Sequence, residues 1–572
     1  MRVLDWIVLV ATLVFIVVYG IWKGRGSQDM KGYLLANKTM PWYAVGLSII
    51  ATQASAITFL SAPGQAFSDG MRFVQFYFGL PIAMVVLSVT AVPIYHKLNV
   101  YTAYEYLENR FDLKTRALAA FLFLIQRGVS TGLTIYAPAI ILSSLLGWNT
   151  NLTSIIIGIL VLLYTVFGGT KAVSYTQLGQ VTIILCGMLT AFFMIVYLLP
   201  DDISFMEAVK VAGKTGKMNV IDLEFNPNSQ YNIWSGLIGG FFLQMSYFGT
   251  DQSQVGRYLA GSSIGQSRLG LLFNGIVKVP MQFCILFIGI VLFVFYQFVM
   301  PPIIFNRFET NKILSSSYAN EYRELEERQK SIFDQKQVHV RQLVEAMRQQ
   351  DEGQISAAQQ RLQQSLAQDT TIRGAAIRIM KQNDDKAEVN DTNYVFLNFV
   401  TTYLPAGVVG LLIAVVFSAS MASSASAFNS LTSTTIVDVY RRIFRSEESE
   451  AHYLLMSKLI TVAWGIFCIV VALYAGKVGN LLEAVNRLGS LFYGGILGIF
   501  VCAFYFKIIK GAATFYAALV TEAIIFALFY FTDIAFLWYN VIGCLLVILF
   551  GLFFNMVLPH KTPAPSIASS KK

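Results

Sequence analysis

The chain has 572 residues, of which 55% are hydrophobic and 13% charged, with a mean hydropathy of +0.58. Long apolar runs recur from one end to the other, so the composition excludes an ordinary soluble domain and indicates a polytopic membrane protein. The net charge of +9 does not indicate a nucleic-acid partner, because the basic residues lie at the ends of apolar runs and report topology instead.

The hydrocarbon core of a bilayer, about 30 Å thick, needs about 20 apolar residues for each helix. On that measure we predict an all-α protein with thirteen transmembrane helices, near residues 4–22, 42–62, 73–95, 117–146, 152–169, 177–199, 233–256, 270–300, 405–436, 454–475, 488–507, 511–531 and 534–557.

Basic residues predict the orientation of these helices. They gather in alternate loops, as in Lys97, Arg110, Lys114 and Arg116, whereas the short loops on the other side hold little beyond Arg72 and Lys477. The positive-inside rule then places the N-terminus outside and the tail 558–572 in the cytoplasm. The first span lacks a small-residue cleavage site and is expected to remain as a helix. A bacterial inner membrane is the expected location.

The second span is unusually polar. It reads "LSIIATQASAITFLSAPG", with Thr52, Gln53, Ser55 and Thr58 ahead of a proline and a glycine. Polar groups are costly in hydrocarbon, so we expect an interrupted helix whose freed carbonyls suit a small alkali cation. The alternative is that each hydroxyl bonds back to its own helix.

Charged and amide side chains also occur deep in later spans. Arg127 lies nine or ten residues into its span, where an arginine must face a cavity or a partner. Lys278 is expected to extend to the inner surface, and Glu483 is expected to pair with Arg487 on its own helix. The five cysteines fall within spans without paired spacing, so disulfides and metal sites are not expected.

One segment differs from the rest of the chain. Residues 307–393 are rich in Glu, Gln, Arg and Lys and form good helices by composition. We therefore divide the chain into helices 1 to 8 in 1–306, an extramembrane helical insertion in 307–393, helices 9 to 13 in 394–557, and the tail 558–572. The insertion is either a solvated structural addition or a docking site for a partner protein.

A serine-rich stretch follows the insertion. "FSASMASSASAFNS" at 417–430 contains six serines within an apolar span. At about 100° per residue, all but Ser418 fall on one broad face, which should point into the protein. Close helix packing and cation binding both explain such a face, and the pattern alone does not separate them.

Several motifs together resemble the sodium:solute symporter family, namely "GQAFSDGMRFVQFYFGLPIAM", "YTAYEYLENRF", "YTVFGGTKAVSYTQLGQ", "GTDQSQVGRYLAG" and "FNSLTSTTIVDVYRR". The resemblance covers nearly the whole chain outside the insertion. It implies a LeuT-type fold: two inverted repeats of five helices, at 42–199 and 233–507, with one extra helix before them and two after.

The resemblance also implies where sodium binds. In the family the cation lies between the broken first core helix and the eighth core helix. The corresponding ligands here are the carbonyls of Ala51, Ala54 and Ala419 and the hydroxyl of Ser423. Two positions depart from the pattern: Ala422 replaces a second hydroxyl, and Gln177 stands where many members have an aspartate. We therefore expect a single coupled Na⁺.

The solute pocket implied by the resemblance is lined by amide, hydroxyl and guanidinium groups, with Tyr247 as the inner gate. These groups belong to Gln53, Ser55, Thr58, Gln75, Arg127 and Gln244. Arg127 resembles the arginine that binds the carboxylate in sialic-acid-type members, and its forked donor suits a carboxylate. The expected function is sodium-coupled import by alternating access of an organic anion, with an acidic sugar ahead of a monocarboxylate.

Other functions are possible on this sequence. A neutral sugar or vitamin symporter shares the same motifs. A membrane sensor built on a transporter scaffold would use the insertion as its interaction module. An enzyme is not expected, because no nucleophile with a base and no metal-ligand set occurs within the spans. The expected partners are thus Na⁺, a small solute and the bilayer.

Overall fold

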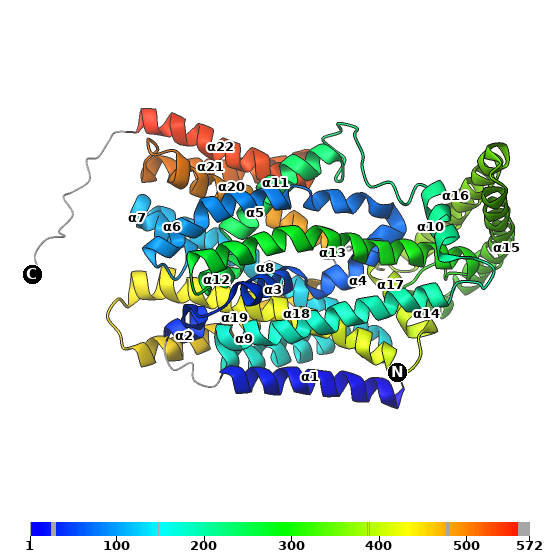
Figure 1. Cartoon of the computed structure of the whole chain (residues 1–572), viewed down its shortest axis with the longest axis horizontal. Coiled ribbons are helices and arrows are strands. Elements are labelled where there is room, and N and C mark those ends of the chain that lie inside the picture. Colours follow the sequence, from blue (N-terminus) through cyan, green and yellow to red (C-terminus); the bar gives the residue numbers. More distant parts are fainter. Residues whose placement is uncertain are drawn as a thin grey trace, which may run out of the picture.

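The computed structural model describes residues 2–24, 30–146, 148–385, 387, 389–475 and 481–558. Within these ranges the chain forms a bundle of long helices with charged helices at one end (Figure 1). The expected tail 558–572 lies outside the described residues, except for Leu558. The helices of the first half are α1 Val3–Gly24, α2 Met30–Leu35, α3 Trp42–Gln53, α4 Ala56–Asp69, α5 Leu80–Val89, α6 Ala91–Leu98, α7 Ala103–Arg110, α8 Leu113–Leu146, α9 Thr150–Tyr197, α10 Phe205–Lys214, α11 Gly240–Gly249, α12 Gln252–Leu259 and α13 Ile264–Phe298.

The second half contains α14 Arg307–Leu314, α15 Ala319–Gln349, α16 Glu352–Asn383, α17 Thr392–Tyr403, α18 Val408–Thr434, α19 Glu450–Tyr474, α20 Leu481–Tyr505, α21 Gly511–Phe531 and α22 Phe536–Val557. Short non-α turns complete the set: the 3₁₀ segments η1 Ala36–Lys38 and η2 Gly70–Tyr77, and the π segments η3 Ser235–Gly239 and η4 Thr435–Phe444.

Ten helical segments in the described part are long and apolar enough to cross a membrane. The number differs from thirteen because helix ends and predicted spans do not coincide. The spans predicted at 152–169 and 177–199 form the single element α9, which contains a non-helical residue at Gly169, with φ +58°. The predicted span 233–256 is divided among η3, α11 and α12. Thirteen crossings remain a prediction.

The second predicted span is interrupted in the structure. Helix α3 ends at Gln53, and Ala54 (φ −81°, ψ 79°) and the extended Ser55 separate it from α4. The Ser55 N–H donates to the Gln53 carbonyl at 3.0 Å, which frees the Ala51 carbonyl from the bond that a continuous helix would make. This break supplies backbone acceptors in the middle of the bundle, where helical pairing otherwise satisfies them.

Helix α18, which carries the serines, lies in the centre of the bundle between α8, α9 and α1. It is buried on all sides along almost its whole length, so the serines are not confined to a single inward face. Its start is fixed by Asp5 of α1, whose carboxylate accepts the N–H groups of Gly407 at 2.6 Å and Gly410 at 3.2 Å.

Helices α14, α15 and α16 lie at the end of the bundle where α1 begins, opposite the end of α22 (Figure 1). We call α15 and α16 the arm. Their apolar residues, among them Val340, Leu343 and Leu362, pack into a buried seam. The arm contacts α10 through Arg348, whose Nε donates to Glu207 at 2.7 Å. That side-chain hydrogen bond, together with the cap from Ser204, lowers the pKa of Glu207 to about 2. The domain boundaries and the side of the membrane remain predictions.

Candidate functional site

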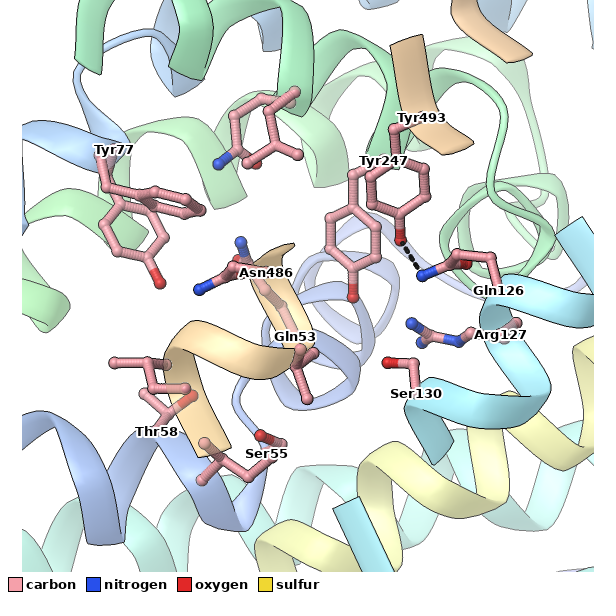
Figure 2. A pocket seen from close by; sticks show the side chains of 16 residues that line it. Gln53, Ser55, Thr58, Tyr77, Gln126, Arg127, Ser130, Tyr247, Asn486 and Tyr493 are labelled. Carbon is pink, nitrogen blue, oxygen red and sulfur yellow. Dashed lines mark hydrogen bonds between the residues drawn. The ribbon is translucent and has the colours of Figure 1, made fainter. Parts of the chain in front are cut away.

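A cavity of about 90 Å³ lies between the broken helix, α8, α11 and α20, and its wall combines polar and apolar side chains (Figure 2). Five of the six predicted solute-binding residues line it, namely Gln53, Ser55, Thr58, Arg127 and Gln244, together with the predicted gate Tyr247. The interruption at residues 54 and 55 positions the first three, because it turns the chain between α3 and α4 toward the cavity. The sequence analysis did not identify Gln126, Ser130, Asn486 or Tyr493, which also line it.

Arg127 is buried and faces both a cavity and a partner, as its depth in the span predicted. Its Nη1 lies 3.7 Å from Oδ2 of Asp251, and its guanidinium carbon lies 5.8 Å from the centre of the Tyr247 ring. Its Nε is buried without a hydrogen-bond partner in the described part of the chain. The pairing with Asp251 is therefore loose, and donor capacity is left for a solute.

Asp251 is the anchor of this polar cluster. Its Oδ2 accepts the Tyr493 hydroxyl at 2.9 Å, and its Oδ1 accepts the backbone N–H of Ser253 at 2.8 Å at the start of α12. Gln126 donates in turn to the Tyr493 hydroxyl at 3.3 Å (Figure 2). These donors and the guanidinium give the buried carboxylate hydrogen-bond and charge partners inside the bundle. The signal for it was present in "GTDQSQ", as an aspartate within the predicted span 233–256.

The cavity wall also presents acceptors. The Oε1 atoms of Gln53 and Gln244 are buried without partners among the described residues. Tyr247 accepts a hydrogen bond from Gln254 Nε2 at 2.8 Å, and its hydroxyl points toward the space that the Arg127 guanidinium also faces (Figure 2). Buried polar atoms without partners are uncommon. Amide oxygens and a guanidinium together suit a solute that has both hydroxyl donors and an anionic group.

Gln75 requires a correction, because it does not line this cavity. Its amide donates to the carbonyl of Tyr231 at 3.2 Å and accepts the N–H of Asp222 at 3.1 Å. Residues 70–77 form a 3₁₀ segment, whereas a transmembrane helix was predicted to begin near residue 73. Gln75 holds the 215–234 loop against the bundle.

The four predicted sodium ligands lie where the break faces α18. Ala51 packs against Ala422 of α18, and Ser423 lines a small cavity of about 60 Å³ that also includes Ser55. Ser423 donates to the Ala419 carbonyl at 3.0 Å. Hard cations prefer oxygen ligands of this kind, namely three backbone carbonyls (Ala51, Ala54 and Ala419) and one hydroxyl (Ser423). Their role as ligands stays a prediction.

Gln177 of α9 connects its own helix with α3 and α18. Its Nε2 donates to the Ala422 carbonyl at 3.0 Å and to the Ser426 hydroxyl at 2.8 Å, and its Oε1 accepts the Ser48 hydroxyl at 2.6 Å. The Ser426 hydroxyl lies 2.9 Å from that of Thr52. An amide donor therefore occupies this junction between α3, α9 and α18, where hydroxyl and carbonyl oxygens converge.

Two other predictions about charged side chains in the spans are settled by the structure. Glu483 and Arg487 form the expected pair, with 2.8 Å between Oε1 and Nη2. The expectation for Lys278 was wrong: its side chain is fully buried behind the cavity wall, with Nζ 5.5 Å from the centre of the Tyr77 ring and no hydrogen-bond partner among the described residues. Packing by α5 and η2 around α13 encloses it before it can reach a surface.

Comparisons with known proteins agree on one family. The model of the "Sodium:solute symporter family" matches residues 33–315 and 376–521. The human sodium-coupled monocarboxylate transporter 1 is 26% identical over 499 residues, covering 87% of this chain and 68% of the relative. The sodium/sialic acid symporter SiaT of Proteus mirabilis is 23% identical over 578 residues, covering 99% and 97%.

The fold is also matched. A solved Na⁺-coupled sialic acid symporter in a substrate-bound outward-open state superimposes with a TM-score of 0.75 at 21% identity, and the match covers 98% of each chain. The expected LeuT-type architecture is thereby confirmed. The family is one of sodium-coupled transporters, and the helices are those of an integral membrane protein. This chain belongs to the sodium:solute symporter family, and its coupling ion is Na⁺.

Proposed function

We propose that the chain imports an organic anion together with sodium, with an acidic sugar as the first candidate. The observation that carries this proposal is the position of Arg127, a buried guanidinium with a free donor in the wall of the central cavity. A carboxylate is the group that such a fork binds best. Hydroxyl groups of a sugar can donate to the unpartnered oxygens of Gln53 and Gln244. The resemblance to sialic acid symporters supports the same class.

A small monocarboxylate is the second candidate. The cavity measures about 90 Å³, which is narrow for a sugar acid unless its walls separate. The human relative named for monocarboxylates supports it as well. The polar part of the wall fits a monocarboxylate less fully than a sugar acid. A monocarboxylate has few hydrogen-bond donors to offer the two glutamine oxygens.

The transport mechanism that we infer is alternating access. Sodium bound by the carbonyls of Ala51, Ala54 and Ala419 and the hydroxyl of Ser423 would hold the break against α18 and so favour the conformation that binds solute. Tyr247 would close the inner side of the cavity until the solute is released. By linkage, the solute must then strengthen sodium binding by the same factor as sodium strengthens solute binding.

A single sodium ion per solute is supported by the junction around Gln177. Its NH₂ group already donates to the carbonyl of Ala422 and the hydroxyl of Ser426, so those oxygens are satisfied without a cation. A carboxylate there would need a positive partner, whereas an amide does not. The location that we propose is a bacterial inner membrane, with the N-terminus outside and the C-terminus in the cytoplasm.

The test is uptake of labelled N-acetylneuraminate into proteoliposomes, driven by an inward sodium gradient and compared with an equal potassium gradient. Accumulation with sodium alone supports the proposal, and lactate in parallel distinguishes the second candidate. Accumulation of a neutral hexose but of neither anion would overturn it. The number of sodium ions moved per solute molecule tests the stoichiometry, and a value of two would overturn the single sodium site.

A further inference from the structure

A second, larger cavity of about 380 Å³ lies between the arm and the end of the bundle where α4, α13 and α17 meet. One wall is aromatic: the Phe67 ring lies 5.8 Å from that of Phe293 and 5.9 Å from that of Tyr296. The opposite wall comes from α15 and α16. Residues 316–375, which include most of the arm, lie outside the match to the family model, so this cavity is partly formed by a segment that the family pattern lacks.

Two acceptors in this cavity are buried without partners among the described residues. Gln297 is 3% exposed, and its Nε2 donates to the Phe293 carbonyl at 2.7 Å, which leaves Oε1 unpartnered. Asp369 of α16 binds Lys336 through Oδ2, while its Oδ1 is buried and unpartnered. Acceptors enclosed in this way favour a ligand that brings hydrogen-bond donors.

More cations than carboxylates line the same cavity. Three cations and two carboxylates line it, and two of the cations are already paired, Lys336 with Asp369 and Arg373 with Asp391. The third, Lys217, donates to the Ser68 carbonyl and lies 5.0 Å from the centre of the Phe293 ring. It forms no ion pair within the described part of the chain, although Asp69 is near enough to act through its field. An anionic group is therefore the natural partner of Lys217.

We propose that this cavity is a second solute site, for a hydroxylated carboxylate of the acidic-sugar class. The carboxylate would meet Lys217, hydroxyl groups would donate to Gln297 and Asp369, and the apolar face of the sugar ring would lie against Phe293 and Tyr296. The ligand class rests on the proposed function. The site itself contains neither Arg127 nor any proposed sodium ligand, so its binding is independent of sodium.

The test is equilibrium binding of labelled N-acetylneuraminate and D-glucuronate to the full chain in nanodiscs, in sodium-free choline buffer. The wild type and the variant Arg127→Met/Asp251→Asn, which alters the central cavity, should both bind. Lys217→Met and Gln297→Leu should each weaken binding by about tenfold or more, the loss of one charge-assisted or buried hydrogen bond. Lys210→Met, on the exposed face of α10, is the matched control and should bind as the wild type does. Thermal unfolding of each variant checks that it is folded.

Three outcomes would overturn the proposal: no sodium-free binding of either acid, binding unchanged in both Lys217→Met and Gln297→Leu, or binding lost in Arg127→Met/Asp251→Asn, which would assign it to the central cavity. Uptake by the same purified proteins, reconstituted into proteoliposomes, separates the two proposals. Sodium-driven accumulation without sodium-free binding refutes only the second site, whereas sodium-free binding without accumulation refutes only the transport proposal.

Discussion

Replacing Arg127 by methionine should have two separable effects, one on stability and one on uptake. The variant leaves the carboxylate of Asp251 buried without its cation. Breaking a buried ion pair in this way costs about 3–5 kcal/mol. The lower end, about 3 kcal/mol, applies here because the pair is 3.7 Å apart and Asp251 keeps its hydrogen bonds from Tyr493 and Ser253. The variant should therefore unfold at a lower temperature in detergent.

The second effect concerns the solute. A hydrogen bond to a charged group contributes about 1.5–3 kcal/mol, which corresponds to roughly a 10- to 150-fold rise in KM for an anion. The double variant Arg127→Met/Asp251→Asn separates the effects, because it removes both charges and leaves an amide that can still accept the Tyr493 hydroxyl. It should recover stability to within about 1 kcal/mol of the wild type while KM for N-acetylneuraminate stays high.

The assay combines thermal unfolding of the purified protein with sodium-driven uptake at several solute concentrations in proteoliposomes. A double variant that is stable and transports the anion with the wild-type KM would refute the assignment of Arg127 to the carboxylate. A single variant as stable as the wild type would show that Asp251 does not depend on the guanidinium at all.

Three further predictions follow from other parts of the bundle. Gln177→Leu should lower the unfolding temperature, since each acceptor left unpaired costs about 1–3 kcal/mol. Gln180→Leu on the same helix should not, because it removes an amide that has no partner among the described residues; scanning calorimetry compares the two variants. Gly289→Ala places a Cβ 2.1 Å from a backbone oxygen of α4 and should reduce uptake, while Gly374→Ala on α16 meets nothing within 4 Å and should leave it intact. The pKa of Glu207 lies below its ordinary value of 4.5, at about 2, so its bond to the arm should hold above about pH 4.5 and be lost as the pH falls toward 2. Pepsin cleavage of the wild-type arm should rise as the pH falls through that range, and cleavage of Glu207→Gln should change less with pH. Equal pH profiles of the two proteins would contradict the role of Glu207.

The sequence predicted the features that depend on local chemistry. Polar residues followed by proline and glycine marked the break near Ala54, and the cost of an arginine in hydrocarbon required Arg127 to have a partner or a cavity. The pair of Glu483 with Arg487 followed from their spacing on one helix. Each of these depends on neighbours within a turn or two of helix, or on depth in the membrane.

What the sequence did not predict depends on contacts between distant segments. Asp251 meets Arg127 across more than a hundred residues, and no periodicity points to that meeting. Gln75 was assigned to the cavity from the family resemblance, but its 3₁₀ segment places its amide against Tyr231 and Asp222. Lys278 was expected at a surface, yet the packing of neighbouring helices encloses it. The Gln177 junction likewise requires knowing that α3, α9 and α18 meet.

The arm has a practical consequence for imaging this protein. Small transporters without soluble parts are difficult to orient in electron micrographs, because a detergent or lipid belt hides their helices. Here α15 and α16, of 31 and 32 residues, form a rod roughly 45 Å long at about 1.5 Å per residue. The rod lies against the end of the bundle, which α15 contacts from Gln329 to Arg348. Its buried seam and the ion pair of Arg348 with Glu207 of α10 fix its direction relative to the bundle. The chain therefore carries its own alignment marker, and an antibody fragment raised against the tip would enlarge that marker without touching the transport path.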